Sequence, residues 1–359
     1  MPERSQRRAA LTARFNELKI DALVISHLPN VRYLTGFTGS NALLAVTPAH
    51  GAVLYTDSRY EEQAAQQVDC PTTITRGTWK AAAGWLKRQR VRQVGFEAAH
   101  VTVEERDWFL SYLGETAPPL APVGRVVEQQ RMVKSAGEVE RISHAVQIKS
   151  LAYAAALARF KAGMTERELA AEIGYQMRRG GAEDTAFDTI VASAAQSALP
   201  HAHPSDAPIV PNRLLLIDMG ARHEGYTSDM TRVVVPGRIA PADRRLYAAV
   251  LEAQLAAIDA VKPGVTAGRI DAAARGTLKK HSLDALFKHS TGHGLGLEIH
   301  EAPRLGKGDK TKLQVGMVIT IEPGAYRPGQ GGVRIEDTLL VTESGCRVLT
   351  PTAKQLVAI

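Results

Sequence analysis

Cysteine is scarce in this chain of 359 residues. Cys70 and Cys346 are the only two, too few for a disulfide framework or a thiolate metal cage. Long apolar runs are missing as well, since no stretch approaches the roughly 18 consecutive apolar residues of a membrane-spanning helix. The charged segment 1–8 lacks the apolar run of a secretory signal. We therefore expect a soluble cytoplasmic protein without a membrane partner.

An excess of one charge sign is also small. Lysine plus arginine number 44 and aspartate plus glutamate 37, which leaves a net charge of +7. Because the basic residues are scattered rather than set in one block, the sequence argues against a nucleic-acid partner. Hydrophobic residues make up 45% of the chain. That is enough for a sizeable core and excludes a disordered or fibrous protein.

The first third of the chain alternates short apolar runs with helical patterns, which predicts an α/β domain over residues 1–122. Three apolar runs predict strands (22–25, 42–46 and 52–55), and two segments with helical spacing predict helices (58–68 and 79–89). The proline-rich stretch 116–122 cannot continue a helix and marks the end of this domain. Residues 123–134 are predicted to be a linker.

A capping box opens the second domain, predicted to cover residues 135–359. Ser135 and Glu138 have the spacing of an N-cap and its N3 partner, and apolar residues keep helical spacing behind them as far as Phe160. Later patterns predict alternating strands and helices: strands 214–217, 231–235, 318–321 and 338–341, and helices 244–261 and 267–281.

An internal repeat divides this second domain. Three short motifs recur in the same order with slowly drifting offsets: KAGMT 161–165 as KPGVT 262–266, IDMGA 217–221 as IEPGA 321–325, and DMT 229–231 as EDT 336–338. A single match of this length would be chance. Three in order predict a domain built of two pseudo-symmetric halves.

Each half carries two acidic residues at matched positions. Asp218 and Asp229 belong to the first half, Glu322 and Glu336 to the second, and the first acid of each pair ends an apolar strand. Four carboxylates that converge near a pseudo-two-fold axis repel one another and would have to take up protons. Two divalent cations carry four positive charges and balance them. The repeat therefore predicts a metal cluster.

His293 lies in a glycine-rich run, residues 291–296. The glycines allow close backbone approach and leave the imidazole free to face a ligand. The run resembles part of a dinucleotide fingerprint, but no strand rich in Val and Ile leads into it. The chain also lacks the Gly-x-Ser-x-Gly elbow, the His-Glu-x-x-His helix and the phosphate-binding loop.

Five motifs together resemble the Xaa-Pro peptidases, the family of prolidase and aminopeptidase P. The motifs are IDMG 217–220, GYTSDMTR 225–232, GHGLGLEIHE 292–301, IEPG 321–324 and RIED 334–337. Residues 30–37 resemble the amino-terminal domain of this family more loosely. The resemblance implies an α/β (α+β) protein, with a creatinase-like amino-terminal α/β domain and a catalytic domain of the pita-bread fold.

The resemblance also implies a dinuclear metal site. It assigns Asp218, Asp229, His293, Glu322 and Glu336 as the ligands of two divalent metal ions, with Asp229 and Glu336 bridging them. An oxygen-rich set with one imidazole and no thiolate favours Mn(II) or Co(II), with Zn(II) as an alternative. The same resemblance gives Glu322 the catalytic role of taking the proton from the attacking water.

Further residues of the site follow from the same resemblance. His201, His289 and His300 match family histidines near the cluster, and His201 and His300 are expected to contact the substrate. Arg304 resembles the prolidase residue that binds a free substrate carboxylate. Arg334 is grouped here with the substrate-binding residues and matches an arginine that supports the cluster. The function predicted first is hydrolysis of Xaa-Pro dipeptides.

Two alternatives stay open. Aminopeptidase P acts on longer Xaa-Pro-Yaa peptides, and a pita-bread protein without catalytic activity is a more distant reading, because all five ligands are present. The family resemblance also implies a homodimer.

Two positions depart from the family pattern. Ala194 stands where glycine is usual, which bears on the flexibility of its loop, and His223-Glu224 precede Gly225 where an apolar residue is commoner, which predicts a more polar rim.

Overall fold

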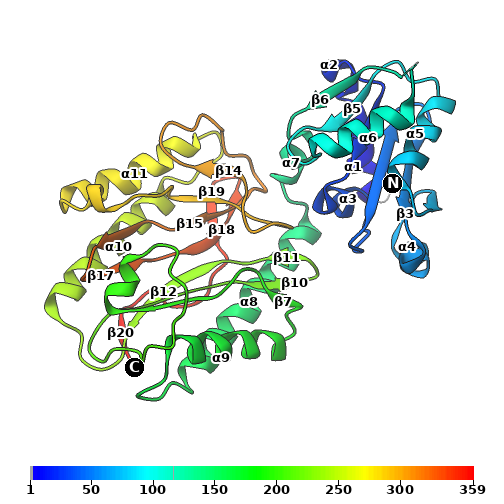
Figure 1. Ribbon diagram of the computed structural model, residues 1–359. Coiled ribbons are helices and arrows are strands. Elements are labelled where there is room, and N and C mark those ends of the chain that lie inside the picture. The colour runs from blue at the N-terminus through cyan, green and yellow to red at the C-terminus, as the bar shows by residue number, and fades with distance from the viewer. Residues whose placement is uncertain (1–2, 116) are drawn as a thin grey trace. The chain divides into compact units, whose positions relative to one another are not determined.

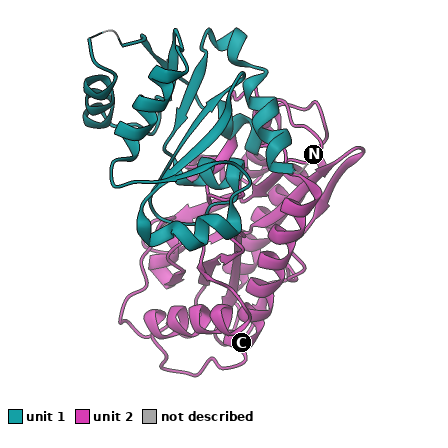
Figure 2. Cartoon of the chain, turned by 90° about the vertical axis from the view of Figure 1, so that its right-hand side faces the viewer, with its two compact units in different colours: residues 1–131 teal, residues 132–359 magenta. Residues whose placement is uncertain are grey.

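The computed structural model describes residues 3–115 and 117–359 and divides the chain into two compact units (Figure 2). Unit 1 ends at Arg131 and unit 2 begins at Met132. This division falls inside the predicted linker 123–134, because helix α7 (Val126–Arg131) buries two valines within unit 1. Parts of two sequence predictions, residues 1–2 of the charged amino terminus and Thr116, lie outside the described residues.

Unit 1 is a mixed six-stranded sheet with helices, in the strand order β4-β3-β2-β1-β5-β6 (Figure 1). Its strands are β1 (Ala22–Ile25), β2 (Ala42–Thr47), β3 (Gly51–Thr56), β4 (Thr72–Ile74), β5 (Val94–Glu97) and β6 (Leu120–Val123). Its other helices are α1 (Glu3–Thr12), α2 (Phe15–Leu18), α3 (Leu28–Thr35), η1 (Ser58–Tyr60), α4 (Glu61–Gln67), α5 (Thr78–Arg88) and α6 (Val103–Leu113). The α/β character predicted for this part of the chain is what the structure has.

The proline-rich stretch does not end the first domain, contrary to the prediction. Its last residues form β6, which pairs in parallel with β5. Pro122 is tolerated there because β6 is an edge strand, where a missing amide proton breaks no bond to a further strand. A proline-rich composition reports the loss of backbone donors and cannot distinguish a linker from a sheet edge.

Unit 2 contains four long helices and the strands that follow them (Figure 1). The helices are α8 (Ala136–Leu157), α9 (Glu166–Arg179), α10 (Pro241–Asp259) and α11 (Ala267–Lys280). The strands are β7 (Asp184–Thr185), β8 (Ile190–Ser193), β9 (Leu215–Met219), β10 (Ala221–His223), β11 (Tyr226–Thr227), β12 (Met230–Val235), β13 (Gly292–Gly294), β14 (Glu301–Leu305), β15 (Val318–Ile321), β16 (Gly324–Arg327), β17 (Gly331–Arg334), β18 (Asp337–Thr342), β19 (Gly345–Val348) and β20 (Val357–Ala358). The predicted capping box of Ser135 and Glu138 opens α8.

The two halves of the repeat have matching topology. In the first, a helix pair (α8, α9) precedes the antiparallel pair β9–β12, and in the second α10 and α11 precede β15–β18. Each pair is joined through a short hairpin, β10–β11 or β16–β17. The main sheets run β20-β12-β9-β8 and β14-β13-β15-β18-β19. The two halves therefore repeat the same order of elements, a helix pair followed by two antiparallel strands joined through a hairpin.

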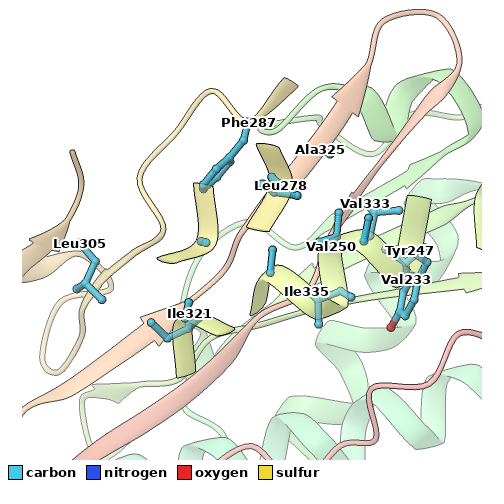
Figure 3. Packing of buried hydrophobic residues seen from close by; sticks show 14 of the residues in the cluster. Val233, Tyr247, Val250, Leu278, Phe287, Leu305, Ile321, Ala325, Val333 and Ile335 are labelled. Atoms are coloured by element: carbon cyan, nitrogen blue, oxygen red, sulfur yellow. The ribbon is translucent and has the colours of Figure 1, made fainter. Parts of the chain in front are cut away.

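The largest hydrophobic core joins these halves. Val233 of β12 and Val250 of α10 belong to the same cluster as Ile321 of β15 and Ile335 beyond β17 (Figure 3). All four are at most 1% exposed. Because β12 begins directly after Asp229 and β15 ends directly before Glu322, this packing fixes the strands that carry acids of both halves. Within the described residues, none of the helices is long and apolar enough to cross a bilayer.

Candidate active site

One cavity of unit 2, with a volume of about 560 Å³, gathers the predicted site residues. Its lining includes all ten: Asp218, Asp229, His293, Glu322, Glu336, His201, His289, His300, Arg304 and Arg334. These residues come from separate strands and loops of both halves. The fold therefore brings together side chains that lie far apart in the chain.

Four strand ends carry the acids. Asp218 lies near the end of β9 and Asp229 just before β12, while Glu322 follows β15 and Glu336 precedes β18. The two antiparallel pairs thus present their acids at equivalent ends, as the repeat predicted. The Thr231 hydroxyl on β12 donates to Glu336 Oε2 (2.8 Å), which ties an acid of the second half to a strand of the first.

His293 lies between acids of both halves. Its Nε2 atom is 3.6 Å from Asp229 Oδ2 and 3.6 Å from Glu322 Oε1. Asp229, His293 and Glu336 each offer a ligand atom, and these atoms all lie within 4.8 Å of one another. One ion can contact all three, because metal bonds to nitrogen and oxygen ligands are about 2.0–2.2 Å long.

Two glycines place His293 within the sheet rather than in a loop. A Cβ atom at Gly292 would lie 2.0 Å from the Thr320 carbonyl oxygen, and one at Gly294 would lie 2.2 Å from that of Ala302. Only glycine permits such close strands on both sides of the histidine. The His293 Nδ1–H group donates to the Gly294 carbonyl (2.9 Å), which leaves Nε2 unprotonated and facing the acids. Burial lowers the pKa of this imidazole to about 4.

The acids are buried and repel one another. Burial first, and then neighbouring carboxylates, raise the pKa of Asp229 and Glu322, and burial with the charge of Asp218 raises that of Glu336 to about 7. Asp218 Oδ1 and Glu336 Oε1 are buried without a hydrogen-bond partner among the described residues. Unpaired buried carboxylate oxygens are costly unless a cation joins them. This donor set therefore fits divalent metal ions.

Arg334 supports the acids from within the protein. Its guanidinium donates to the Asp218 carboxylate (2.6 Å), the hydroxyls of Thr231 (3.0 Å) and Tyr326 (2.8 Å), and the Pro200 carbonyl (3.2 Å). The side chain is 3% exposed. The guanidinium is therefore fully engaged by protein acceptors and holds them in place around the acids.

His289 is held as a neutral imidazole next to the cluster. Its Nδ1–H group donates to the Ser290 carbonyl (2.8 Å), and the Tyr326 hydroxyl donates to Nε2 (2.8 Å). Nδ1 lies 3.9 Å from Glu322 Oε2. Burial and the nearby Arg334 charge lower the pKa of His289 to about 3, so the ring carries no charge near neutral pH.

His201, His300 and Arg304 are exposed at the wall of the same cavity. The His300 ring centre lies 4.5 Å from that of His293. Arg304, on β14, is paired in register with His293 on β13. Across residues 3–115 and 117–359, no hydrogen bond or ion pair engages the Arg304 guanidinium. A cation and two imidazoles therefore stand open beside the acid cluster.

The cavity wall also includes residues that the sequence analysis did not select. Among them are Phe187, Asp188, Ile190, His203 and Ile299. One signal was present in the sequence. His203 is two residues after His201, a spacing that puts alternate side chains of an extended segment on one side. Ile190 is paired with Asp218 of β9 in the register of β8, which only the structure shows.

The two departures from the family pattern have local outcomes. Ala194 adopts φ +51°, the left-handed region that favours glycine. His223 and Glu224 lie at the hairpin between β10 and β11, where Arg141 Nε donates to Glu224 Oε2 (2.9 Å). Neither residue belongs to the cavity lining, so these two side chains add no polar group to the wall of the cavity itself.

Comparison with known proteins identifies the family. Residues 140–343 match metallopeptidase family M24, and residues 7–133 match the creatinase/prolidase amino-terminal domain. The chain belongs to metallopeptidase family M24. The predicted fold class, a creatinase-like domain followed by a pita-bread peptidase domain, is confirmed, and so is membership of a family of metal-dependent peptidases.

Similar proteins match over nearly the whole chain. An Xaa-Pro dipeptidase of Pyrococcus horikoshii is 38% identical over 94% of this chain and 95% of its own length. The solved structure of an Xaa-Pro dipeptidase from Bacillus anthracis has a TM-score of 0.95 and 34% identity, covering 99% of this chain and 100% of that one. An X-Pro aminopeptidase structure from Thermotoga maritima has a TM-score of 0.90 and 35% identity, covering 96% and 100%.

Proposed function

We propose that this chain is a dinuclear metal-dependent peptidase that hydrolyses the Xaa-Pro bond of dipeptides. The observation that carries the proposal is the open Arg304 guanidinium on the wall of the cavity that holds the acid cluster. A dipeptide ends one residue beyond its scissile bond, so its carboxylate needs a cation close to the reacting centre. The similarity to proteins named Xaa-Pro dipeptidases supports this substrate class.

Asp218, Asp229, His293, Glu322 and Glu336 would hold the metal ions. Their oxygen-rich donor set with one imidazole favours Mn(II) or Co(II) over Zn(II). Divalent ions bound at such a site lower the pKa of a water molecule and polarise a peptide carbonyl.

The other residues of the cavity bind, orient and move protons. Glu322 accepts the proton of the attacking water. His289 lies 3.9 Å from that carboxylate as a neutral ring whose two nitrogens are engaged by Ser290 and Tyr326. His201 and His300 donate ring N–H groups to oxygen atoms of the substrate and stabilise the charge that develops on its carbonyl. Arg334 acts by fixing Asp218, because its guanidinium is occupied by protein acceptors.

Replacement of Arg304 by alanine tests this assignment. A charge-assisted bond to a carboxylate contributes about 1.5–3 kcal/mol, or roughly 10- to 150-fold in binding. We expect Arg304→Ala to lower kcat/KM for Ala-Pro by that order, mostly through KM. An Ala-Pro-Yaa tripeptide, whose carboxylate lies one residue further out, should lose less. The exposed Lys307, which lies outside the cavity lining, gives the control Lys307→Ala.

The same measurements separate dipeptidase from aminopeptidase activity. Arg304→Lys should recover part of the loss if the contact is bidentate. Equal losses on both peptides would show that Arg304 is structural. A wild-type preference for the tripeptide would instead identify an aminopeptidase P, the activity named for the Thermotoga maritima structure. A homodimer and a cytoplasmic location stay predictions.

A further inference from the structure

One part of the cavity wall is formed by a loop rather than by a strand. Residues 194–204, named here the His201 loop, leave β8 after Ser193 and lead to Ser205. Four consecutive residues of the loop, 200–203, line the cavity. Strand pairing fixes His293 and the strands beside the acids, whereas a loop has no ladder of hydrogen bonds to hold it. The place of His201 therefore depends on the separate contacts that its loop makes.

A single buried carboxylate joins the two ends of this loop. Glu166 is the first residue of α9 and is 2% exposed. Its Oε1 atom accepts from the Ser193 amide (2.7 Å), and its Oε2 atom accepts from the amide (3.0 Å) and hydroxyl (2.7 Å) of Ser205. The carboxylate therefore closes the His201 loop at its base.

The loop accounts for the burial of this carboxylate. In the part of the chain that the structure describes, no cation pairs with Glu166, and its side chain has no polar partners besides the two serines. A buried carboxylate is costly unless hydrogen bonds satisfy it. The start of α9 also binds the returning chain directly, because the Arg167 amide donates to the Ser205 carbonyl (3.0 Å). Helix and loop base thus form one connected unit.

Contacts from the second half hold the same loop nearer to its tip. The Gly332 amide donates to the Ser197 hydroxyl (2.9 Å), and the Arg334 guanidinium donates to the Pro200 carbonyl (3.2 Å). Both donors belong to β17. The His201 loop is therefore held between α9 of the first half and β17 of the second.

We propose that Glu166 is a positioning residue for His201. Its carboxylate fixes the base of the loop, so that the ring N–H of His201 meets the substrate carbonyl; this role of His201 rests on the proposed function. Both carboxylate oxygens are needed, because each end of the loop presents an N–H donor. A glutamine has one acceptor oxygen, so its amino group would face an N–H at one end, and that end must move.

Two glutamates in the same helical turn provide a matched pair of variants. Glu166→Gln removes one acceptor from the base of the loop. Glu168 is exposed and accepts instead from the amide (2.8 Å) and hydroxyl (3.1 Å) of Thr165. Glu168→Gln removes the same charge from the start of α9, and glutamine still serves as a capping partner there. It is therefore the control for a loss caused by helix stability alone.

The activity test combines these variants with His201→Ala. Each protein is loaded with Mn(II), checked for metal content and assayed on Ala-Pro. We expect Glu166→Gln to lower kcat/KM on the order of tenfold, mostly through kcat, because His201 meets charge that develops in the transition state. In the His201→Ala background the same change should alter kcat/KM by less than about twofold, since its effect passes through the histidine. Glu168→Gln should stay within about twofold of the wild type.

Several results would overturn the proposal. They are an unchanged kcat/KM in Glu166→Gln, an equal loss in Glu168→Gln, and a loss that persists undiminished in the His201→Ala background. Loss of metal from Glu166→Gln would do the same, because the effect would then pass through the acid cluster. If Glu166→Gln does not fold, Ser205→Ala removes the hydroxyl bond to the carboxylate and should give a smaller loss that His201→Ala also abolishes.

Hydrogen exchange measures the loop without reference to activity. Amides of residues 193–205 should exchange faster in Glu166→Gln and at the wild-type rate in Glu168→Gln. If the wild type does not cleave Ala-Pro while this exchange pattern holds, the proposed function fails and the closure of the loop by Glu166 stands. Unchanged exchange in Glu166→Gln would defeat the positioning role, whatever the activity.

Discussion

Ala194 offers a direct test of the backbone conformation beside the active site. It follows β8 and begins the 3-10 turn η2 (Ala194–Ala198), which leads into the segment that carries His201. Its φ of +51° lies in the left-handed region. That conformation costs an L-residue roughly 1–2 kcal/mol, whereas glycine adopts it without a Cβ penalty.

Ala194→Gly should therefore stabilise the protein. Relief of about 1–2 kcal/mol is partly offset by the greater entropy of glycine in the unfolded chain, about 0.4–1 kcal/mol. We expect a net gain of about 0.5–1 kcal/mol in the free energy of unfolding. For a unit of this size that is a rise in Tm of roughly 1–4 °C.

Calorimetry and urea unfolding of the full chain measure the effect against a matched control. Ala192 precedes Ala194 by two positions and is fully buried in β8. Ala192→Gly should lower the free energy of unfolding by about 1.5 kcal/mol, because it removes a buried methyl group and because glycine gives the unfolded chain more conformational entropy. Ala194→Val should also destabilise, because a β-branched residue is a strained choice at positive φ. If Ala194→Gly lost as much stability as Ala192→Gly, the reasoning from left-handed strain would be refuted.

Two further predictions concern the acid cluster and its sheet. In the metal-free protein, burial raises the pKa of Glu336 to about 7, so the folded state binds more protons than the unfolded state near neutrality. Stability should then fall by roughly 1 kcal/mol between pH 6.5 and 8; thermal melts with a chelator test this, and a flat profile would contradict it. Gly292→Ala should push the strand from the Thr320 carbonyl and lower both stability and metal content, by about 1–3 kcal/mol or more in unfolding. Gly276→Ala, in open space on α11, should instead be neutral or stabilising, and equal effects of the two would show that strand approach is unimportant.

The sequence alone determined much of the chemistry. Matched motifs in the two halves selected Asp218, Asp229, Glu322 and Glu336, and one cavity contains all four. Such prediction works because a repeat reports equivalent positions in three dimensions, whatever the details of the fold. Apolar periodicity also placed the strands and helices that it predicted within a few residues of their observed bounds, because it reports local burial.

Only the tertiary structure decided how each polar atom is used. Arg304 and Arg334 are the same residue type, and the sequence does not tell them apart. Arg304 is open to the cavity, whereas the Arg334 guanidinium donates to four protein groups. The proline-rich stretch became an edge strand because β5 was available to pair with it. Lys134 and Glu301, far apart in the chain, meet only after β14 and the start of unit 2 are in place. Local sequence reports the propensity and burial of each segment, whereas these pairings depend on how distant strands register with one another.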